Sequence, residues 1–183
     1  MTAKAVPTVA TAPQVLRALL DAGAPSLTAA RVIAAQTALE TAGWGTVNGQ
    51  GFYDWNLGNI KATDANAAIL PDGGSYEAYP SLLSGAQALI HWIAVHGGSA
   101  MAAADSGDVT GFVTALKNAG YFEAPLASYV SGTESWYRRI AGVTPSPPWI
   151  QIGATVAIVG GSAAAIVAIR KGWFDSLIDR MWP

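Results

Sequence analysis

A long uncharged segment near the C-terminus constrains the fold of this chain more than any other feature. No Asp, Glu, Lys or Arg occurs in the 30 residues between Arg139 and Arg170, and residues 149–169 are nearly all apolar or small. As an α-helix this segment would be about 32 Å long at ~1.5 Å per residue, close to the ~30 Å hydrocarbon core of a bilayer. Residues typical of membrane interfaces flank it, namely Trp149, Arg170, Lys171 and Trp173. The sequence therefore predicts one transmembrane helix over 149–169, with a buried helix of a soluble protein as the alternative.

The residues around this segment define the predicted domain organisation. Residues 144–148 read Thr-Pro-Ser-Pro-Pro, which predicts an extended linker because proline disrupts helices. A soluble domain is predicted over 13–143, preceded by a flexible segment over 1–12 that lacks the apolar core of a signal peptide. Residues 170–183 carry apolar side chains at helical spacing, which predicts an amphipathic tail on the membrane surface.

The composition excludes several classes of protein. The chain has 183 residues, 51% hydrophobic and 12% charged, which excludes an intrinsically disordered protein. A net charge of −2 argues against a basic surface, so we expect no nucleic acid partner. The lack of cysteine removes disulfides, thiolate metal sites and thiol nucleophiles. His91 and His96 lie five residues apart without the Glu of a metalloprotease motif, so we expect neither a metal site nor a cofactor.

The predicted soluble domain is mostly helical. N-cap residues, Pro in a first turn and Gly at the ends delimit five helices, over 13–21, 26–41, 81–96, 108–119 and 126–140. Segment 60–79 differs, because Pro71-Asp72-Gly73-Gly74 lies between short apolar and aromatic runs, a pattern that predicts a β-hairpin. The fold class is therefore mainly α (α+β), with a small β-hairpin lobe.

Glu40 is the residue whose position most suggests chemistry. It lies at the end of the predicted helix 26–41, whose alanine-rich positions belong in a core, and Gly43 and Trp44 follow it. A carboxyl group that is partly buried at a helix C-terminus is disfavoured as an anion. A general acid for glycoside cleavage has to keep its proton near neutral pH, which such a position favours. The alternative is a surface glutamate on an amphipathic helix.

Four motifs, in order along the chain, resemble a known family. They are Ala35-Gln36 with Leu39-Glu40 and Gly43-Trp44-Gly45, then Asn56-Leu57 with Ile60-Lys61-Ala62, then Tyr79-Pro80-Ser81, and finally Leu116 with Ala119-Gly120-Tyr121, Pro125 and Tyr129. Over roughly residues 15–140 the chain resembles the glucosaminidase domains of flagellar peptidoglycan hydrolases and bacterial autolysins. Each motif alone is weak, but four in this order are specific.

The resemblance implies a lysozyme-like fold with a cleft for peptidoglycan glycan strands between two lobes. It implies that Glu40 protonates the glycosidic oxygen, and that Tyr121 holds the reacting sugar or assists the second step. Tyr121 as a core aromatic is the alternative. Trp44 and Trp55 are expected either to stack on sugar faces or to pack in the core. Other expected substrate-binding residues are Asn59, Lys61 and Tyr79.

A second carboxylate has several candidates. In the resembling family it comes from the hairpin, where this chain offers Asp64, Asp72 and Glu77. Asp72 is expected to form the turn, so Asp64 and Glu77 are favoured equally as catalytic residues, and Asp54 is a further candidate. Catalysis by Glu40 alone, assisted by the N-acetyl group of the substrate, is the alternative.

The chain departs from the family pattern at two places. The Asp that usually follows the Gly-Tyr motif is absent from the run Gly120-Tyr121-Phe122-Glu123-Ala124-Pro125. Gly58-Asn59 stands where a bulky aromatic residue is usual. Both changes are expected to alter contacts with the substrate.

Together these features predict a membrane-anchored peptidoglycan hydrolase of the N-acetylglucosaminidase type. A lytic transglycosylase or muramidase on the same fold is one alternative, and an inactive wall-binding protein is another. A wall-degrading domain with a C-terminal anchor and no signal peptide suggests a role in phage lysis or genome delivery. We expect a single-pass protein of the bacterial envelope or the virion, with its domain facing the wall. Gly160, Ala164 and Ala168 recur along one face of the predicted membrane helix, where a membrane or virion protein could pack.

Overall fold

The first of two compact units contains all the residues that can be described. A computed structural model of the chain describes residues 3–47, 50–62, 67–70 and 73–148. Contacts divide the chain into residues 1–151 and 152–183. The predicted transmembrane helix over 149–169 and the predicted tail over 170–183 lie outside the described residues. Within the described ranges, no helix combines the length and apolar character needed to cross a bilayer.

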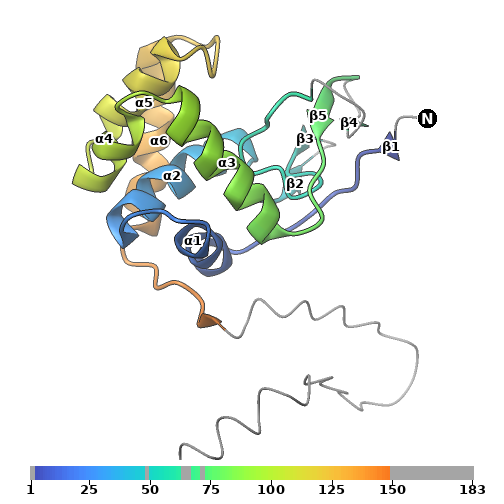
Figure 1. Cartoon of the computed structure of the whole chain (residues 1–183), viewed down its shortest axis with the longest axis horizontal. Coiled ribbons are helices and arrows are strands. Elements are labelled where there is room, and N and C mark those ends of the chain that lie inside the picture. The colour runs from blue at the N-terminus through green and yellow to red at the C-terminus, as the bar shows by residue number, and fades with distance from the viewer. Residues whose placement is uncertain (1–2, 48–49, 63–66, 71–72, 149–183) are drawn as a thin grey trace, which may run out of the picture. The chain divides into compact units, whose positions relative to one another are not determined.

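The first unit is mainly helical, and the helices are gathered on one side of it (Figure 1). The six helices of the described residues are α1 (Ala12–Asp21), α2 (Leu27–Glu40), α3 (Leu82–His96), α4 (Ala100–Ser106), α5 (Val109–Asn118) and α6 (Leu126–Ile140). All five predicted helices are confirmed. The Ser26 and Ser81 hydroxyls each accept a hydrogen bond of 3.1 Å from a backbone N–H three residues on. The Asp108 carboxylate accepts one of 2.8 Å from Gly111 N, so three of these helices begin at the side chains that the sequence indicated.

Helix α4 is not among the predicted helices. Its seven residues, AMAAADS, carry no apolar periodicity, and glycines enclose them on both sides. Gly107 ends the helix in the left-handed conformation, with φ of +79°. Ala100 and Ala104 are fully buried, so packing against the neighbouring α2 and α5 stabilises a helix too short to be stable alone.

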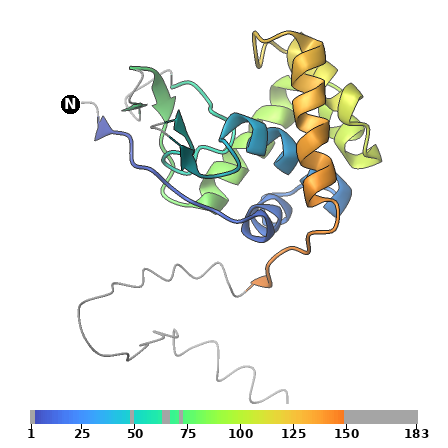
Figure 2. The same ribbon diagram turned by 180° about the vertical axis from the view of Figure 1, so that it is seen from behind.

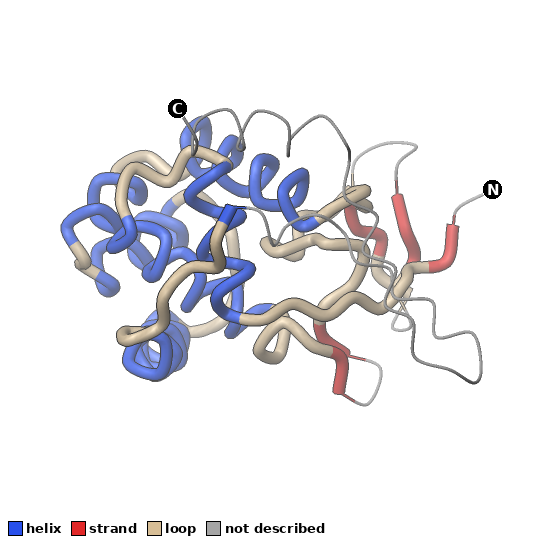
Figure 3. Tube along the Cα trace, turned by 90° about the horizontal axis from the view of Figure 1, so that it is seen from below, coloured by secondary structure: helices blue, strands red, loops and turns tan. Residues whose placement is uncertain are grey.

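Short strands form a second lobe beside the helices, as Figure 3 shows. Strands β4 (Ala67–Ile69) and β5 (Ser75–Glu77) are antiparallel, with Ala68 opposite Tyr76, which confirms the predicted hairpin. Strand β1 (Ala3–Lys4) adds to β4 in parallel. A separate pair joins β2 (Thr46–Val47) to β3 (Gln50–Gly51).

The N-terminal segment differs from the expectation of a flexible end. Residues 3–11 cross the strand lobe and reach α1, and their backbone N–H groups find partners there. Thr8 N donates to Phe52 O and Ala10 N to Trp44 O, both at 3.0 Å. The prediction was wrong for these residues because hydrogen bonding to distant backbone groups leaves no local pattern in the sequence. The linker 144–148 also contacts the unit, since Ser146 N donates to Pro13 O at 2.8 Å.

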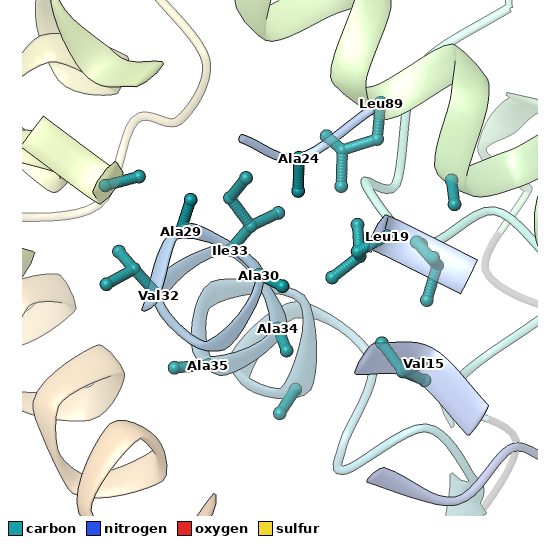
Figure 4. Packing of buried hydrophobic residues seen from close by; sticks show 14 of the residues in the cluster. Val15, Leu19, Ala24, Ala29, Ala30, Val32, Ile33, Ala34, Ala35 and Leu89 are labelled. Atoms are coloured by element: carbon teal, nitrogen blue, oxygen red, sulfur yellow. The ribbon is translucent and has the colours of Figure 1, made fainter. Parts of the chain in front are cut away.

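Helix α2 lies at the centre of the core. Figure 4 shows Ala29, Ala30, Ile33 and Ala34 on the side of α2 that faces α1 and α3. Seen from behind, α6 lies over α2 (Figure 2), and the two helices are in contact. A Cβ on Gly132 of α6 would lie 2.9 Å from the Leu39 side chain, so glycine permits this close approach. The buried helix α2 thereby fixes the position of its last residue, Glu40.

Candidate active site

A cleft of about 440 Å³ opens beside the C-terminal end of α2. It lies between the loop at 58–61 and strand β5 on one side, and α3 and the loop after α5 on the other. Polar and aromatic side chains line it, among them Glu40, Asn59, Lys61, Tyr76, Trp92 and Tyr121. The cleft thus lies where the strand lobe meets the helices.

The backbone after α2 turns sharply and brings Glu40 to the cleft wall. Helix α2 ends at Glu40, and Ala42, Gly43 and Trp44 all have positive φ, between +51° and +76°. A Cβ on Gly43 would lie 2.8 Å from the Trp136 ring, so this position requires glycine for space as well as for conformation. The predicted placement of Glu40, at a helix end before a glycine turn, is confirmed.

Two side chains, one from helix α6 and one from the loop of the strand lobe, hold the Glu40 carboxyl group. The Tyr129 hydroxyl, on α6, donates a hydrogen bond to Glu40 Oε1. Asn59 Nδ2, from the loop of the strand lobe, lies 2.8 Å from the Glu40 backbone oxygen and 3.4 Å from Oε2. Each carboxyl oxygen therefore has a donor, and the group is held in one orientation.

A buried amide sets the direction of the hydrogen bonds behind Glu40. Gln36 is fully buried one turn before Glu40, and its Nε2 donates to the hydroxyls of Tyr129 at 2.9 Å and Tyr121 at 3.3 Å. Because each hydroxyl accepts from the amide, its own hydrogen points elsewhere. The Tyr129 hydrogen points to Glu40, and the Tyr121 hydrogen points to Gly58 O at 2.5 Å. Gln36 thus sets the direction of donation in two series of hydrogen bonds, one through Tyr129 to Glu40 and one through Tyr121 to Gly58.

Three tyrosines near the site keep their protons to high pH. Burial raises the pKa of Tyr79 to about 12, with a smaller contribution from the Glu77 carboxylate. Burial, followed by the charge of Glu40, raises the pKa values of Tyr121 and Tyr129 well above 10. At neutral pH these phenols are hydrogen-bond donors and acceptors, and none of them is a base.

Strongly alkaline pH is therefore expected to destabilise the protein. In the unfolded chain these tyrosines ionise near pH ~10, whereas the folded chain keeps their protons. The folded state then binds more protons, so the free energy of unfolding, unchanged by these groups below pH ~10, falls as pH rises towards about 12. Chemical denaturation at several pH values measures this fall. It should be shallower in Tyr79→Phe, and an unchanged slope in that variant would contradict the assignment.

The structure brings some of the predicted site residues to the cleft and leaves others away from it. Glu40, Tyr121, Asn59 and Lys61 line the cleft. Trp44 does not, because its indole is 3% exposed, donates to Thr37 Oγ1 at 2.9 Å and packs against Trp136. The expectation that Trp44 stacks on sugar is therefore wrong, and its core alternative describes it.

Other predicted residues do not line the cleft. Trp55 is half-buried and packs edge-on against Phe52. Tyr79 lies beside Glu77, and strand alternation turns Glu77 to the face opposite the cleft-lining Tyr76. Asp54 accepts a hydrogen bond of 3.1 Å from Val6 N and so holds the N-terminal segment. Asp64 and Asp72 lie outside the described residues.

Several cleft residues were not singled out from the sequence. Trp92 of α3 packs edge-on against Tyr121 with ring centroids 4.7 Å apart. Phe122 and Glu123 line the cleft from the loop after α5. Gln36 and Tyr129 were recognised as motif residues without a role. Their roles depend on contacts between α2, α6 and this loop, which only the tertiary structure shows.

A second hollow, of about 350 Å³, lies over α5 and α6. Its lining includes Asp108, Tyr137, Glu134 and Arg138. The last two form an exposed ion pair, with Arg138 Nη1 3.5 Å from Glu134 Oε2. Exposed ion pairs of this kind contribute little energy. The oriented carboxyl group and the buried donors place the candidate active site in the cleft beside α2.

The fold and site describe a mainly helical domain with a carboxyl group set in a cleft between two lobes. Among solved structures, the glycoside hydrolase domain of FlgJ from Salmonella typhimurium is similar to this chain. The TM-score is 0.49 at 22% sequence identity, over 71% of this chain and 85% of that chain. No family model and no curated protein matches the chain. The case for an activity therefore depends on the residues of this chain and their geometry.

Proposed function

We propose that this protein is a glycoside hydrolase that cleaves the β-1,4 glycan backbone of peptidoglycan, with Glu40 as the general acid. The observation that carries the proposal is the Glu40 carboxyl group, held by Tyr129 and Asn59 on the wall of the cleft. Glu40 would give its proton to the glycosidic oxygen as the bond from that oxygen to the anomeric carbon breaks. The four ordered motifs that resemble glucosaminidase domains support the same assignment.

The cleft lining suits an amino-sugar polymer with acidic substituents. Trp92 and Tyr76 offer aromatic surface, Asn59 offers an amide, and Lys61 offers a cation for the carboxylates of muramic acid and its peptides. Tyr121 is assigned a positioning role towards the reacting sugar. Its hydroxyl hydrogen is already donated to Gly58 O, and its ring and the Trp92 ring pack edge to face.

Analysis of the released fragments tests the proposal and identifies the bond. The 183-residue chain is incubated with purified peptidoglycan, and the products are reduced with borohydride and analysed by mass spectrometry, with Glu40→Gln as the matched inactive sample. Reduced N-acetylglucosamine ends that are absent from Glu40→Gln are the expected result. Reduced N-acetylmuramic acid ends would indicate a muramidase, and anhydro ends a lytic transglycosylase. Wall binding without release by either protein would favour the inactive wall-binding alternative.

Replacing Tyr129 with phenylalanine is expected to lower both activity and stability. The change removes a hydrogen bond to a carboxyl group, worth about 1.5–3 kcal/mol, so kcat should fall about 10–100-fold if orientation depends on it. It also leaves one N–H of the buried Gln36 amide without an acceptor, at a cost of about 1–3 kcal/mol in the free energy of unfolding. Tyr137→Phe, on the same helix but away from the cleft, is the control. Equal kcat values for the two variants would show that Tyr129 does not orient Glu40.

We also propose, from the sequence alone, that residues 149–169 anchor the protein in a membrane and that it serves phage lysis or genome delivery. The uncharged segment and its flanking Trp and basic residues support the anchor. Membrane fractionation of the whole chain and of a chain ending at residue 148 tests it, because only the former should sediment with membranes. Detection in purified phage particles would support the virion role, and confinement to the envelope of uninfected cells would exclude it.

A further inference from the structure

Among the carboxylates of the described residues, Glu40 and Glu123 line the cleft. We infer that Glu123 is the second carboxylate of the reaction, which takes the proton from the attacking water. This inference depends on the proposed function. The second carboxylate then comes from the loop after α5 and not from the hairpin. This loop is where the chain lacks the Asp that usually follows the Gly-Tyr motif of the resembling family.

The loop that carries Glu123 is held in one shape by a single side chain. The Lys117 ammonium, in the last turn of α5, donates to the backbone oxygens of Phe122, Glu123 and Ala124 at 3.2, 2.9 and 3.1 Å. An ammonium group has three N–H donors, and each of them has its own carbonyl here. The Glu123 backbone is thereby fixed, while its side chain stays exposed, as a base that binds water requires.

The same loop is connected to the proposed acid. The Phe122 ring stacks on the Tyr129 ring, with centroids 3.7 Å apart and planes 5° apart. Tyr129 in turn donates to Glu40. Through Phe122 and Tyr129, the loop that presents Glu123 also packs against the residue that orients Glu40. The loop backbone that carries the base is thereby joined to the residue that orients the acid, and glycosidase chemistry requires the two carboxyl groups to lie at a defined separation.

The described part of the hairpin offers a weaker candidate. Tyr76 of β5 lines the cleft, and successive side chains of a strand point to opposite faces. Glu77 therefore points away from the cleft, where it lies beside Tyr79. This geometry favours Glu123 over Glu77.

The proposed step balances as a hydrolysis. The Glu123 carboxylate takes one proton from water as the water oxygen bonds to the anomeric carbon. The bond between that carbon and the glycosidic oxygen breaks, and its electron pair stays on the oxygen, which takes the proton of Glu40. The products gain one water, and solvent returns both carboxyl groups to their starting states.

Azide distinguishes a base from a residue that merely supports the loop. In Glu123→Gln we expect kcat on peptidoglycan to fall by about 10²-fold or more. Azide needs no base, because its nitrogen can bond to the anomeric carbon without losing a proton. Added sodium azide should therefore restore turnover and give glycosyl azide products, detected by mass spectrometry. Glu77→Gln, the matched control, should stay within about threefold of the unchanged protein, and azide should not accelerate it.

Lys117 is assigned as a positioning residue for Glu123, and its variant gives a second readout. Lys117→Met is expected to lower kcat about tenfold, because a small displacement of a catalytic group costs up to ~10²-fold in rate. Because both changes act on the same base, the Lys117→Met/Glu123→Gln double variant should be no slower than Glu123→Gln alone. If the fold-decrease in kcat of the double variant equalled the product of the two single decreases, Lys117 would act independently of Glu123.

The outcomes separate this inference from the proposed function. An inactive Glu40→Gln together with a fully active Glu123→Gln would overturn the role of Glu123 and leave the proposed function intact. If Glu123→Gln lost activity and sodium azide did not restore it, the role of Glu123 as a base would also be overturned. If the unchanged protein releases nothing, or releases anhydro ends into which no water enters, both the hydrolase assignment and the role of Glu123 fail.

Discussion

Glu40→Gln is expected to lower kcat on peptidoglycan by about 10²–10⁴-fold, the usual contribution of a general acid. Glutamine keeps the size of the side chain, so α2 and the cleft should keep their shape. Its amide cannot supply the proton that the leaving oxygen needs. The amide oxygen can still accept from Tyr129, so we expect little change in wall binding. Turnover assays and sedimentation with purified peptidoglycan measure the two properties separately.

Glu134→Gln is the matched control for Glu40→Gln. Glu134 lies on α6, and its side chain is 42% exposed and forms an ion pair with Arg138 at the surface. We expect its kcat to be unchanged, because exposed ion pairs contribute little. If Glu40→Gln kept more than a tenth of the activity while folding normally, Glu40 would not be the general acid.

Gly85→Ala is expected to produce the largest loss of stability among small substitutions near the site. A Cβ on Gly85 of α3 would lie 1.8 Å from the Trp55 carbonyl oxygen and 3.0 Å from the carbonyl carbon. Both partners are backbone, so neither can move aside as a flexible side chain would. Overpacking of this kind costs about 3 kcal/mol, which corresponds to a melting temperature lower by about 6–12 °C in a domain of this size.

The same substitution should impair activity from a distance. Asp54, Trp55 and Asn59 all have positive φ, so the loop they form has little freedom to adjust. A shift at Trp55 would displace Asn59, which contacts Glu40. Gly142→Ala is the control, because a Cβ there meets nothing within 4 Å. Thermal unfolding and kcat of both variants test this prediction, and matching melting temperatures would refute the close approach.

Local sequence signals were enough to predict most of the helical framework. Ser26, Ser81 and Asp108 cap backbone donors within three residues, and Gly43 turns the chain after α2. Such interactions depend on neighbours in sequence, so the sequence shows them. Helix α4 and the pairing of β1 escaped prediction because their stability comes from distant segments.

The same distinction holds for the site. Glu40 could be predicted, because a glutamate at a helix end before a glycine turn is visible in the sequence. Trp44 was ambiguous, because an aromatic side chain suits a core as well as a sugar, and only its burial under Trp136 decided the matter.

What only the tertiary structure decided is which groups surround Glu40. Tyr129 is 89 residues and Asn59 19 residues from it along the chain, yet both reach it. Lys117 and Phe122 then connect Glu123 to this group. The sequence alone determined five of the helices and the place of Glu40 at the end of one of them, because helix formation and capping are local. The helix packing and the meeting of the two lobes decided the cleft, because hydrogen bonds and burial between distant residues exist only once the chain has folded.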